Sequence, residues 1–143
     1  MNRIKPIIST KVPSAASFDV GMLLFRVTVA FAMIRIHGWK KVVDMEGEMA
    51  HMPDPLGLGG ELNVLIAIAI NLFFAAFVGL GLLTRVFALG ILPLTLMGLF
   101  MVHLHDPWSM KDAPLMYTMA FGLIALLGPG QYSMDHWILK KLK

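Results

Sequence analysis

The residues best suited to chemistry in this sequence lie inside apolar segments, where polar side chains are unusual. The stretch Val20–Trp39, VGMLLFRVTVAFAMIRIHGW, would form a helix about 30 Å long, enough to cross the hydrocarbon core of a bilayer. It nevertheless carries Arg26, Arg35 and His37, and an arginine at that depth costs roughly 2.5 kcal/mol or more. Such residues usually pair inside a bundle or mark a ligand pathway.

Helical geometry separates these three side chains. With about 100° per residue, Arg26 and His37 fall about 20° apart, whereas Arg35 points to the opposite side. We therefore expect Arg26 and His37 to face other helices. We expect Arg35 to extend toward the outer interface, as long basic side chains do near the end of a span.

Two polar residues on other apolar segments complete a candidate ligand cavity. Asn71 falls near the bilayer middle, and Tyr117 falls in the outer half of the last span. We predict that Arg26, His37 and Asn71 line a cavity for an anionic or quinone-like ligand, to which Tyr117 could donate its hydroxyl. In the alternative, Asn71 makes an interhelical hydrogen bond worth roughly 0.6–2 kcal/mol, and Tyr117 belongs to an interfacial aromatic belt.

Histidines gather at the outer ends of the first and third spans. His37, His103 and His105 fall at similar depth, beside Asp106. Histidine can bind metals or carry protons near neutral pH, so a metal centre and a quinone-linked or proton-linked site are both open. We favour a third interpretation, in which these side chains bind carbonyls and head groups, and we predict no metal. His103 is nevertheless kept among the candidate ligand contacts.

Composition sets the class of protein. Of the 143 residues, 57% are hydrophobic and 15% are charged, which is typical of an integral membrane protein and not of a soluble domain. The net charge of +3 does not indicate nucleic-acid binding, because the basic residues lie at the ends of apolar segments. The absence of cysteine excludes disulfides, thiolate metal sites and thiol redox chemistry.

Four membrane-spanning helices follow from the apolar pattern. The predicted spans are Val20–Trp39, Glu61–Leu83, Val86–Leu104 and Ala113–Leu127, the last extending over Met110–Gly128 to reach a workable length. Ser17 or Asp19 is the expected N-cap of the first span, and Pro93 is expected to kink the third.

The connections are read from turn residues. Residues 40–52 could form a short surface helix that Pro53 and Pro55 must end, and Thr84-Arg85 is expected to form a tight turn. Ser133–Lys143 reads as an interfacial helix whose lysines suit anionic lipids. The fold prediction is thus all-α, a four-helix transmembrane bundle with a C-terminal interfacial helix. Residues 1–17 form a cytoplasmic tail, and residues 18–143 form one membrane domain.

Basic residues predict the orientation. One side of the membrane would collect the following basic residues: Arg3, Lys5, Lys11, Arg85, Lys140, Lys141 and Lys143. The other side would hold Lys40, Lys41 and Lys111. The positive-inside rule therefore predicts that both termini are cytoplasmic.

Five short motifs in one order carry a resemblance to a known family. They are LLFR at Leu23–Arg26, His37-Gly38 with Lys41, GLLTR at Gly81–Arg85, Val102-His103, and GPGQYSMD at Gly128–Asp135. Over roughly Phe18 to Trp137, this series resembles the DoxX family of small four-helix membrane proteins. The resemblance implies a bacterial inner-membrane location and an association with respiratory or sulfur-compound redox chemistry.

By this resemblance, the predicted function is that of an accessory subunit in a quinone-linked or redox membrane complex, with a quinone as the candidate cofactor. Its predicted partners are membrane lipids and redox-complex subunits, and a homo-oligomer is a further option. Catalysis would require a partner or cofactor that carries electrons. The alternative is a non-catalytic assembly protein or a small-solute transporter. Where relatives often carry a glutamate, this chain has Asn71, which supplies no charge to balance Arg26.

Overall fold

The computed structural model of this chain describes residues 14–54 and 56–142. Within those two ranges all of the regular secondary structure is helical, which confirms the predicted fold class. Four helical stretches are long and apolar enough to cross a membrane: Ala15–Val43, Gly60–Leu80, Thr84–Val102 and Trp108–Leu127. The expected number of spans is therefore correct, with boundaries shifted by a few residues.

Several spans are built from more than one segment. The elements in chain order are α1 (Ala15–Ala32), η1 (Met33–Gly38), α2 (Trp39–Val43), α3 (Met45–His51), α4 (Gly60–Ile68), η2 (Ala69–Phe74), α5 (Ala75–Leu80), α6 (Thr84–Met97), η3 (Gly98–Val102), α7 (Trp108–Leu127) and α8 (Met134–Lys141). The segments η1, η2 and η3 are π-helical, so each interrupts or ends a spanning α-helix.

The first helix begins earlier than predicted. Ser14 is its N-cap, with an extended backbone and a side-chain oxygen that accepts from the Ser17 backbone N–H at 3.2 Å. The expectation that Ser17 or Asp19 would cap this helix is wrong, because the polar residues before the apolar run are already helical. Of the predicted tail 1–17, only the last four positions lie within the described residues.

The turn between the second and third spans is also displaced. It comprises Gly81–Leu83, and Thr84 and Arg85 are the first residues of α6. Gly81 has φ 75°, a left-handed conformation that suits glycine, and its N–H donates to the Val78 carbonyl at 3.0 Å. Leu83 also has a positive φ, 45°, which is uncommon for a residue with a side chain.

The remaining boundaries follow the local sequence. The short helices α2 and α3 end before Pro53, as predicted. Helix α6 continues through Pro93 to Met97. Helix α8 lies within the predicted residues 133–143 and is capped by Ser133, whose hydroxyl oxygen accepts from the His136 N–H at 3.1 Å.

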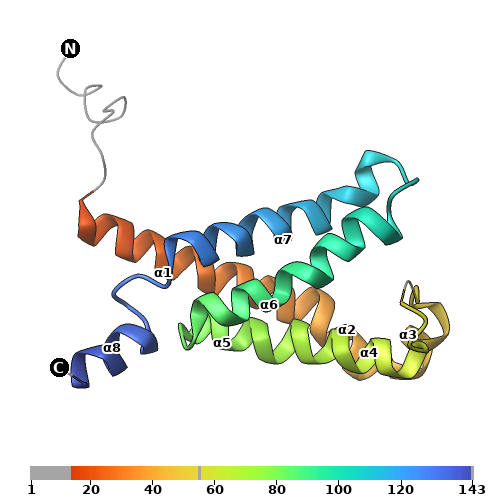
Figure 1. The fold of residues 1–143 in the computed structure, drawn as a ribbon, viewed down its shortest axis with the longest axis horizontal. Helices are drawn as coiled ribbons and strands as arrows, with labels where there is room; N and C mark the ends of the chain where they lie inside the picture. The colour runs from red at the N-terminus through yellow and green to blue at the C-terminus, as the bar shows by residue number, and fades with distance from the viewer. Residues whose placement is uncertain (1–13, 55, 143) are drawn as a thin grey trace, which may run out of the picture.

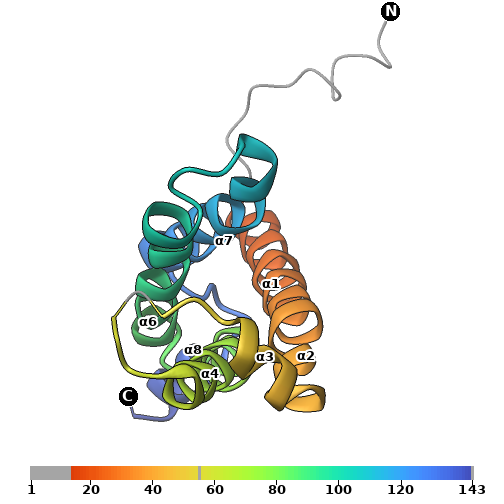
Figure 2. The ribbon, with the colours of Figure 1, turned by 90° about the vertical axis from the view of Figure 1, so that its right-hand side faces the viewer.

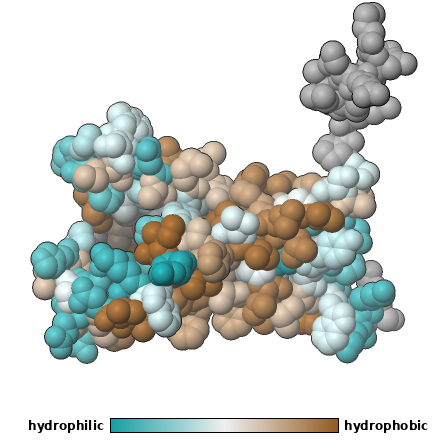
Figure 3. Space-filling view, turned by 180° about the vertical axis from the view of Figure 1, so that it is seen from behind, coloured by the Kyte–Doolittle hydropathy of each residue, from teal (hydrophilic) through white to brown (hydrophobic). Residues whose placement is uncertain are grey.

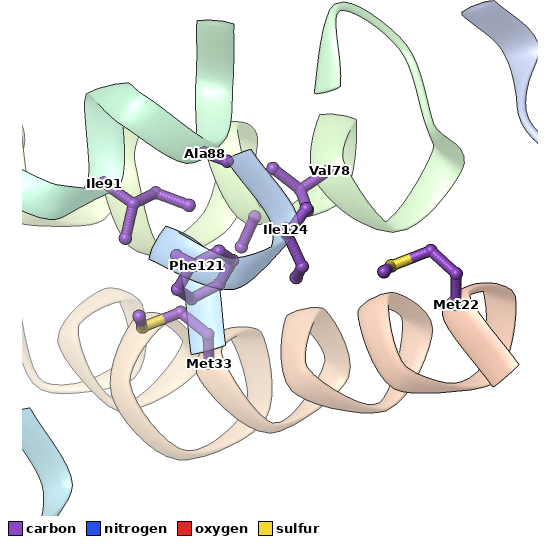
Figure 4. Close-up of a cluster of buried hydrophobic side chains, with 8 residues drawn as sticks. Met22, Met33, Val78, Ala88, Ile91, Phe121 and Ile124 are labelled. Carbon is purple, nitrogen blue, oxygen red and sulfur yellow. The ribbon is translucent and has the colours of Figure 1, made fainter. Parts of the chain in front are cut away.

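The core of the bundle is apolar and close to its middle. Met22 and Met33 come from α1 and η1. They face fully buried apolar side chains of α5, α6 and α7, among them Val78, Ala88, Ile91, Phe121 and Ile124 (Figure 4). Burying such side chains stabilises the bundle through packing, because water and lipid are both excluded there.

The bundle has two unlike ends. At the terminus end, the start of α1, the α5–α6 turn and residues 128–142 lie together (Figure 1). At the loop end, α2 and α3 pack with α4 as one arm, while η3 packs with α6 and α7 as a second arm. The two arms diverge toward that end, as the view from it shows (Figure 2).

Candidate functional site

Arg26 lies inside the bundle with 1% of its surface exposed. Its Nη1 donates to the carbonyls of Val78 at 3.1 Å and Gly79 at 2.8 Å, and its Nη2 donates to the carbonyl of Tyr132. Val78 and Gly79 belong to the last turn of α5, so the guanidinium faces the negative end of that helix. Its Nε is the sole side-chain polar atom in the described ranges that is sealed from solvent without a hydrogen bond.

The segment 128–135, which we call the terminus clamp, joins α1 to the start of α6. Its Gln131 N–H donates to the carboxylate of Asp19 on α1 at 2.9 Å, beside the Arg26 contact with Tyr132. Its Asp135 carboxylate accepts from the N–H groups of Leu83 and Thr84, at 2.7 and 3.0 Å. The same carboxylate accepts from the Thr84 hydroxyl at 2.9 Å, so it caps the start of α6.

His37 and Asn71 lie on two π-helical segments that pack against each other. Gly38, next to His37, is buried so close to η2 that a Cβ added there would lie 3.1 Å from the Asn71 carbonyl oxygen. A π-turn inserts one extra residue, which redirects the side chains that follow it and occurs frequently at functional sites. The contact between η1 and η2 therefore brings two predicted site residues to one seam.

Tyr117 reaches the same region from α7. Its ring and that of His37 meet edge to face, with centroids 5.1 Å apart and an interplanar angle of 87°. Tyr117 lies nine residues, about 14 Å, from the start of α7, and Asn71 lies about 16 Å from the start of α4. His37 and Tyr117 are thus in contact through their rings, and Asn71 lies on the segment that packs against Gly38, the residue after His37.

The side-chain polar groups of His37, Asn71 and Tyr117 have no hydrogen-bond partners within the described ranges. Asn71 is 4% exposed. Its side-chain amide keeps some contact with solvent, because Arg26 Nε is the sole unbonded side-chain polar atom in the described ranges that is sealed from solvent. His37 and Tyr117 are half-buried. An amide without a partner is costly inside a membrane protein, so the cluster is chemically suited to bind a polar group.

Two lysines close to this cluster, Lys40 and Lys41, bond to groups other than the three side chains of the cluster. Lys41 Nζ donates to the His37 carbonyl at 3.1 Å and lies 3.6 Å from the Glu48 carboxylate, and its side chain is 12% exposed. Lys40 pairs with the same carboxylate at 2.7 Å but is 69% exposed. Lys41 was not among the predicted site residues, although it is part of the motif that follows His37-Gly38.

His103 lies at the rim instead of in the cluster. It follows η3, and its Nδ1 donates to the Asp106 carboxylate at 2.8 Å in a half-exposed pair. Among the described residues no group of three or more His, Cys, Asp or Glu side chains is arranged to hold a metal ion. The structure therefore places His103 with Asp106 and places Arg26 with backbone carbonyls, while His37 contacts Tyr117 and lies next to the seam that contains Asn71.

The outer surface has a hollow at the loop end and an apolar band around the middle. In the space-filling view the surface is notched at the loop end, between the two diverging arms (Figure 3). The same view shows a largely hydrophobic band between hydrophilic ends. Exposed aromatic residues occur at both ends of the bundle, with Trp39 and Trp108 at one and Tyr132 and Trp137 at the other. Such belts are typical of membrane–water interfaces.

These features define an integral membrane protein with four spanning helices and a polar cluster between them. The sequence model of the DoxX family matches residues 21–104, and the chain belongs to the DoxX family. It is 30% identical over 127 residues to the inner membrane protein YqjF of Escherichia coli (strain K12), covering 86% of this chain and 95% of that relative. No solved structure matches the chain significantly.

Proposed function

We propose that this DoxX-family protein is an inner-membrane accessory subunit of a quinone-linked or redox complex, in which His37, Asn71 and Tyr117 bind a quinone-like ring. The observation that carries the proposal is the edge-to-face contact of His37 with Tyr117 beside the η1–η2 seam, together with a nearly buried Asn71 amide on that seam that has no hydrogen-bond partner in the described chain. A ring with carbonyl oxygens could accept from the Tyr117 hydroxyl and the Asn71 amide. The inner-membrane location is supported by the name of the relative YqjF.

The charges around the cluster favour a neutral ligand over an anion. Arg26 donates from its Nη groups to three carbonyls. Lys41 donates to the His37 carbonyl and pairs with the Glu48 carboxylate. An anion would require a free cationic partner, because burying a charge without one is expensive. In this proposal Arg26 contributes by fixing the helices, and His103 with Asp106 exchanges protons at the rim.

The electrons in such a complex would come from a partner subunit. Because this chain contains no cysteine, it has no thiolates that could hold an iron–sulfur cluster. Its own residues would bind and orient the ring, and the His37 imidazole could pass a proton to or from a ring oxygen. Membrane lipids and the electron-carrying subunit are the proposed partners. Both termini are assigned to the cytoplasm from the distribution of lysine and arginine.

Titration of the purified protein with a short-chain ubiquinone analogue tests this proposal through quenching of tryptophan fluorescence. Tyr117→Phe keeps the ring but removes the hydroxyl, so it should weaken binding about tenfold, the value of one hydrogen bond. Tyr132→Phe is the matched control, because Tyr132 is exposed at the terminus end and only its carbonyl contacts Arg26. Saturable quenching that Tyr117→Phe weakens supports the proposal. No binding, or equal binding by both variants, contradicts it.

A further inference from the structure

We infer that α8 and the α5–α6 turn form a docking surface that selects anionic lipids in the membrane leaflet at the terminus end. This goes beyond the interfacial helix that the sequence predicts, because it defines a two-sided surface and the class of lipid that the surface prefers. The inference does not depend on the proposed ring site, since it concerns residues of the terminus end only.

Helix α8 is held firmly at its start and is unpacked along the rest of its length. The Asp135 N–H donates to the Gly81 carbonyl at 2.8 Å, and the Asp135 carboxylate accepts from the N–H groups of Leu83 and Thr84. Every residue from 136 to 141 is exposed. The bundle therefore fixes where α8 begins and leaves the remaining surface of this helix for another molecule to cover.

The side of α8 that carries Asp135 is apolar. With about 100° per residue, Ile138, Leu139 and Leu142 fall within about 60° of this aspartate. Leu139 is 60% exposed and Leu142 is 78% exposed, and Leu83 in the adjoining turn is exposed as well. Because this turn joins two spanning helices, the apolar side lies at the edge of the hydrophobic band. Acyl chains are the partner that suits such a side in an interfacial helix.

The opposite side of α8 is cationic and aromatic. Trp137, Lys140 and Lys141 fall about 120–160° away from Asp135 around the helix. The Lys141 Nζ lies 3.7 Å from the centroid of the Trp137 ring, a cation–π contact that keeps the two side chains together. Tryptophan is typical of head-group depth, and lysines near the bilayer surface attract anionic lipids. This side therefore suits negatively charged head groups.

Exposed charge differs in sign between the two ends of the molecule. At the terminus end the carboxylates of Asp19 and Asp135 accept hydrogen bonds from backbone N–H groups, whereas Arg85, Lys140 and Lys141 are exposed. The loop end exposes the following acidic residues: Asp44, Glu46, Asp54, Glu61, Asp106 and Asp112. Complementary charge therefore favours anionic lipid at the terminus end and disfavours it at the loop end.

Quenching of Trp137 fluorescence by brominated lipids tests this surface. The chain has three tryptophans, so Trp39→Phe together with Trp108→Phe leaves Trp137 as the single emitter, and both replaced residues are exposed. The full-length variant in detergent is titrated with brominated phosphatidylglycerol, which is anionic, and with brominated phosphatidylcholine, which is zwitterionic. Half-maximal quenching should need a concentration of phosphatidylglycerol about tenfold lower or more, since each lysine near an anionic surface contributes about fivefold in affinity.

Two further variants of this protein separate charge from structure. Lys140→Gln with Lys141→Gln should bring the ratio of the two half-maximal concentrations to about one, whereas Lys140→Arg with Lys141→Arg keeps the charges and should keep the preference. A protein with Trp39 as its single emitter is the loop-end control and should show no preference for phosphatidylglycerol.

Three results would overturn the inference. The first is equal quenching of Trp137 by the two lipids, and the second is a preference that the glutamine pair retains or that Trp39 shares. The third is the absence of quenching by either lipid, which would mean that water or another protein covers α8. A preference at Trp137 that is lost in the glutamine pair and kept in the arginine pair supports the docking surface.

Discussion

Arg26 and Asp135 bind the two helix ends that meet at the α5–α6 turn, and each has the charge that its helix end favours. Arg26 donates to carbonyls in the last turn of α5, and Asp135 accepts from the first N–H groups of α6. A cation suits a helix C-terminus and an anion suits an N-terminus. The arginine therefore needs no carboxylate in direct contact, and Asn71 is not required to balance it.

Replacing Arg26 by leucine should destabilise the bundle. The change leaves the Gly79 and Tyr132 carbonyls without their donor in a buried place, and such losses cost about 2–4 kcal/mol. Thermal unfolding in detergent should show a clearly lower midpoint. Arg35→Leu is the matched control, because Arg35 is exposed on the same helix and has no hydrogen bond or ion pair to a described residue. Equal midpoints for both variants would mean that the Arg26 contacts contribute nothing.

Replacing Asp135 by alanine should remove the cap of α6. Three hydrogen bonds to Leu83 and Thr84 are lost, and the loss of a helix N-cap typically costs about 1–2 kcal/mol. Asp112→Ala is a suitable control, because Asp112 is exposed. Since Arg26 and Asp135 fix opposite sides of one turn, the double variant should lose less than the sum of the single losses. Additive unfolding energies would show that the two residues act independently.

Enlarging Gly38 should separate the two π-helical segments. Even a Cβ there would press on the side chain of Leu72 and lie 3.1 Å from the Asn71 carbonyl oxygen, so Gly38→Val should cost about 1–3 kcal/mol. The same change should weaken quinone-analogue binding, because His37 and Asn71 would move apart. A Cβ added at Gly21 meets nothing within 4 Å, so Gly21→Val provides the control. Unchanged stability and binding in Gly38→Val would contradict the tight η1–η2 seam.

The packing of α3 against α2 should depend on pH, because Glu48 of α3 pairs with Lys40 and Lys41 of α2. The hydrogen bond from Lys40 lowers the pKa of Glu48 below its ordinary value, and the charge of Lys41 adds to this effect against the opposing effect of burial. A lowered pKa in the folded state means that the carboxylate stabilises the protein fully above about pH 4.5 and loses this effect as the pH falls through the folded value.

The comparison of wild type with Glu48→Gln isolates this effect. At pH 7 the wild type should be more stable by about 0.5–1 kcal/mol, the value of a surface ion pair. The difference between the two unfolding midpoints should vanish as the pH falls through the lowered pKa of Glu48. A difference that persists in acid would show that Glu48 acts through packing and not through its charge.

The amino-acid sequence by itself determined the class of the protein and the number of its spans. Apolar runs of about twenty residues specify membrane helices because every backbone polar group in lipid must be satisfied within the segment. Likewise Pro53 ends α3, and Gly81 permits the left-handed turn after α5. These are local properties of the chain, so reading the residues in order suffices to find them.

Tertiary structure decided which polar residues meet. The hydrogen-bond partners of Arg26 lie 52, 53 and 106 positions away in the sequence, and no local spacing indicates that these carbonyls face it. The π-helical segments rotate His37 and Asn71 away from the directions that a regular 100° step predicts. Only in an unbroken α-helix would the eleven-residue spacing place Arg26 and His37 on one face, and η1 breaks that regularity. Packing between helices instead directs Arg26 to the terminus end and brings His37 to Tyr117.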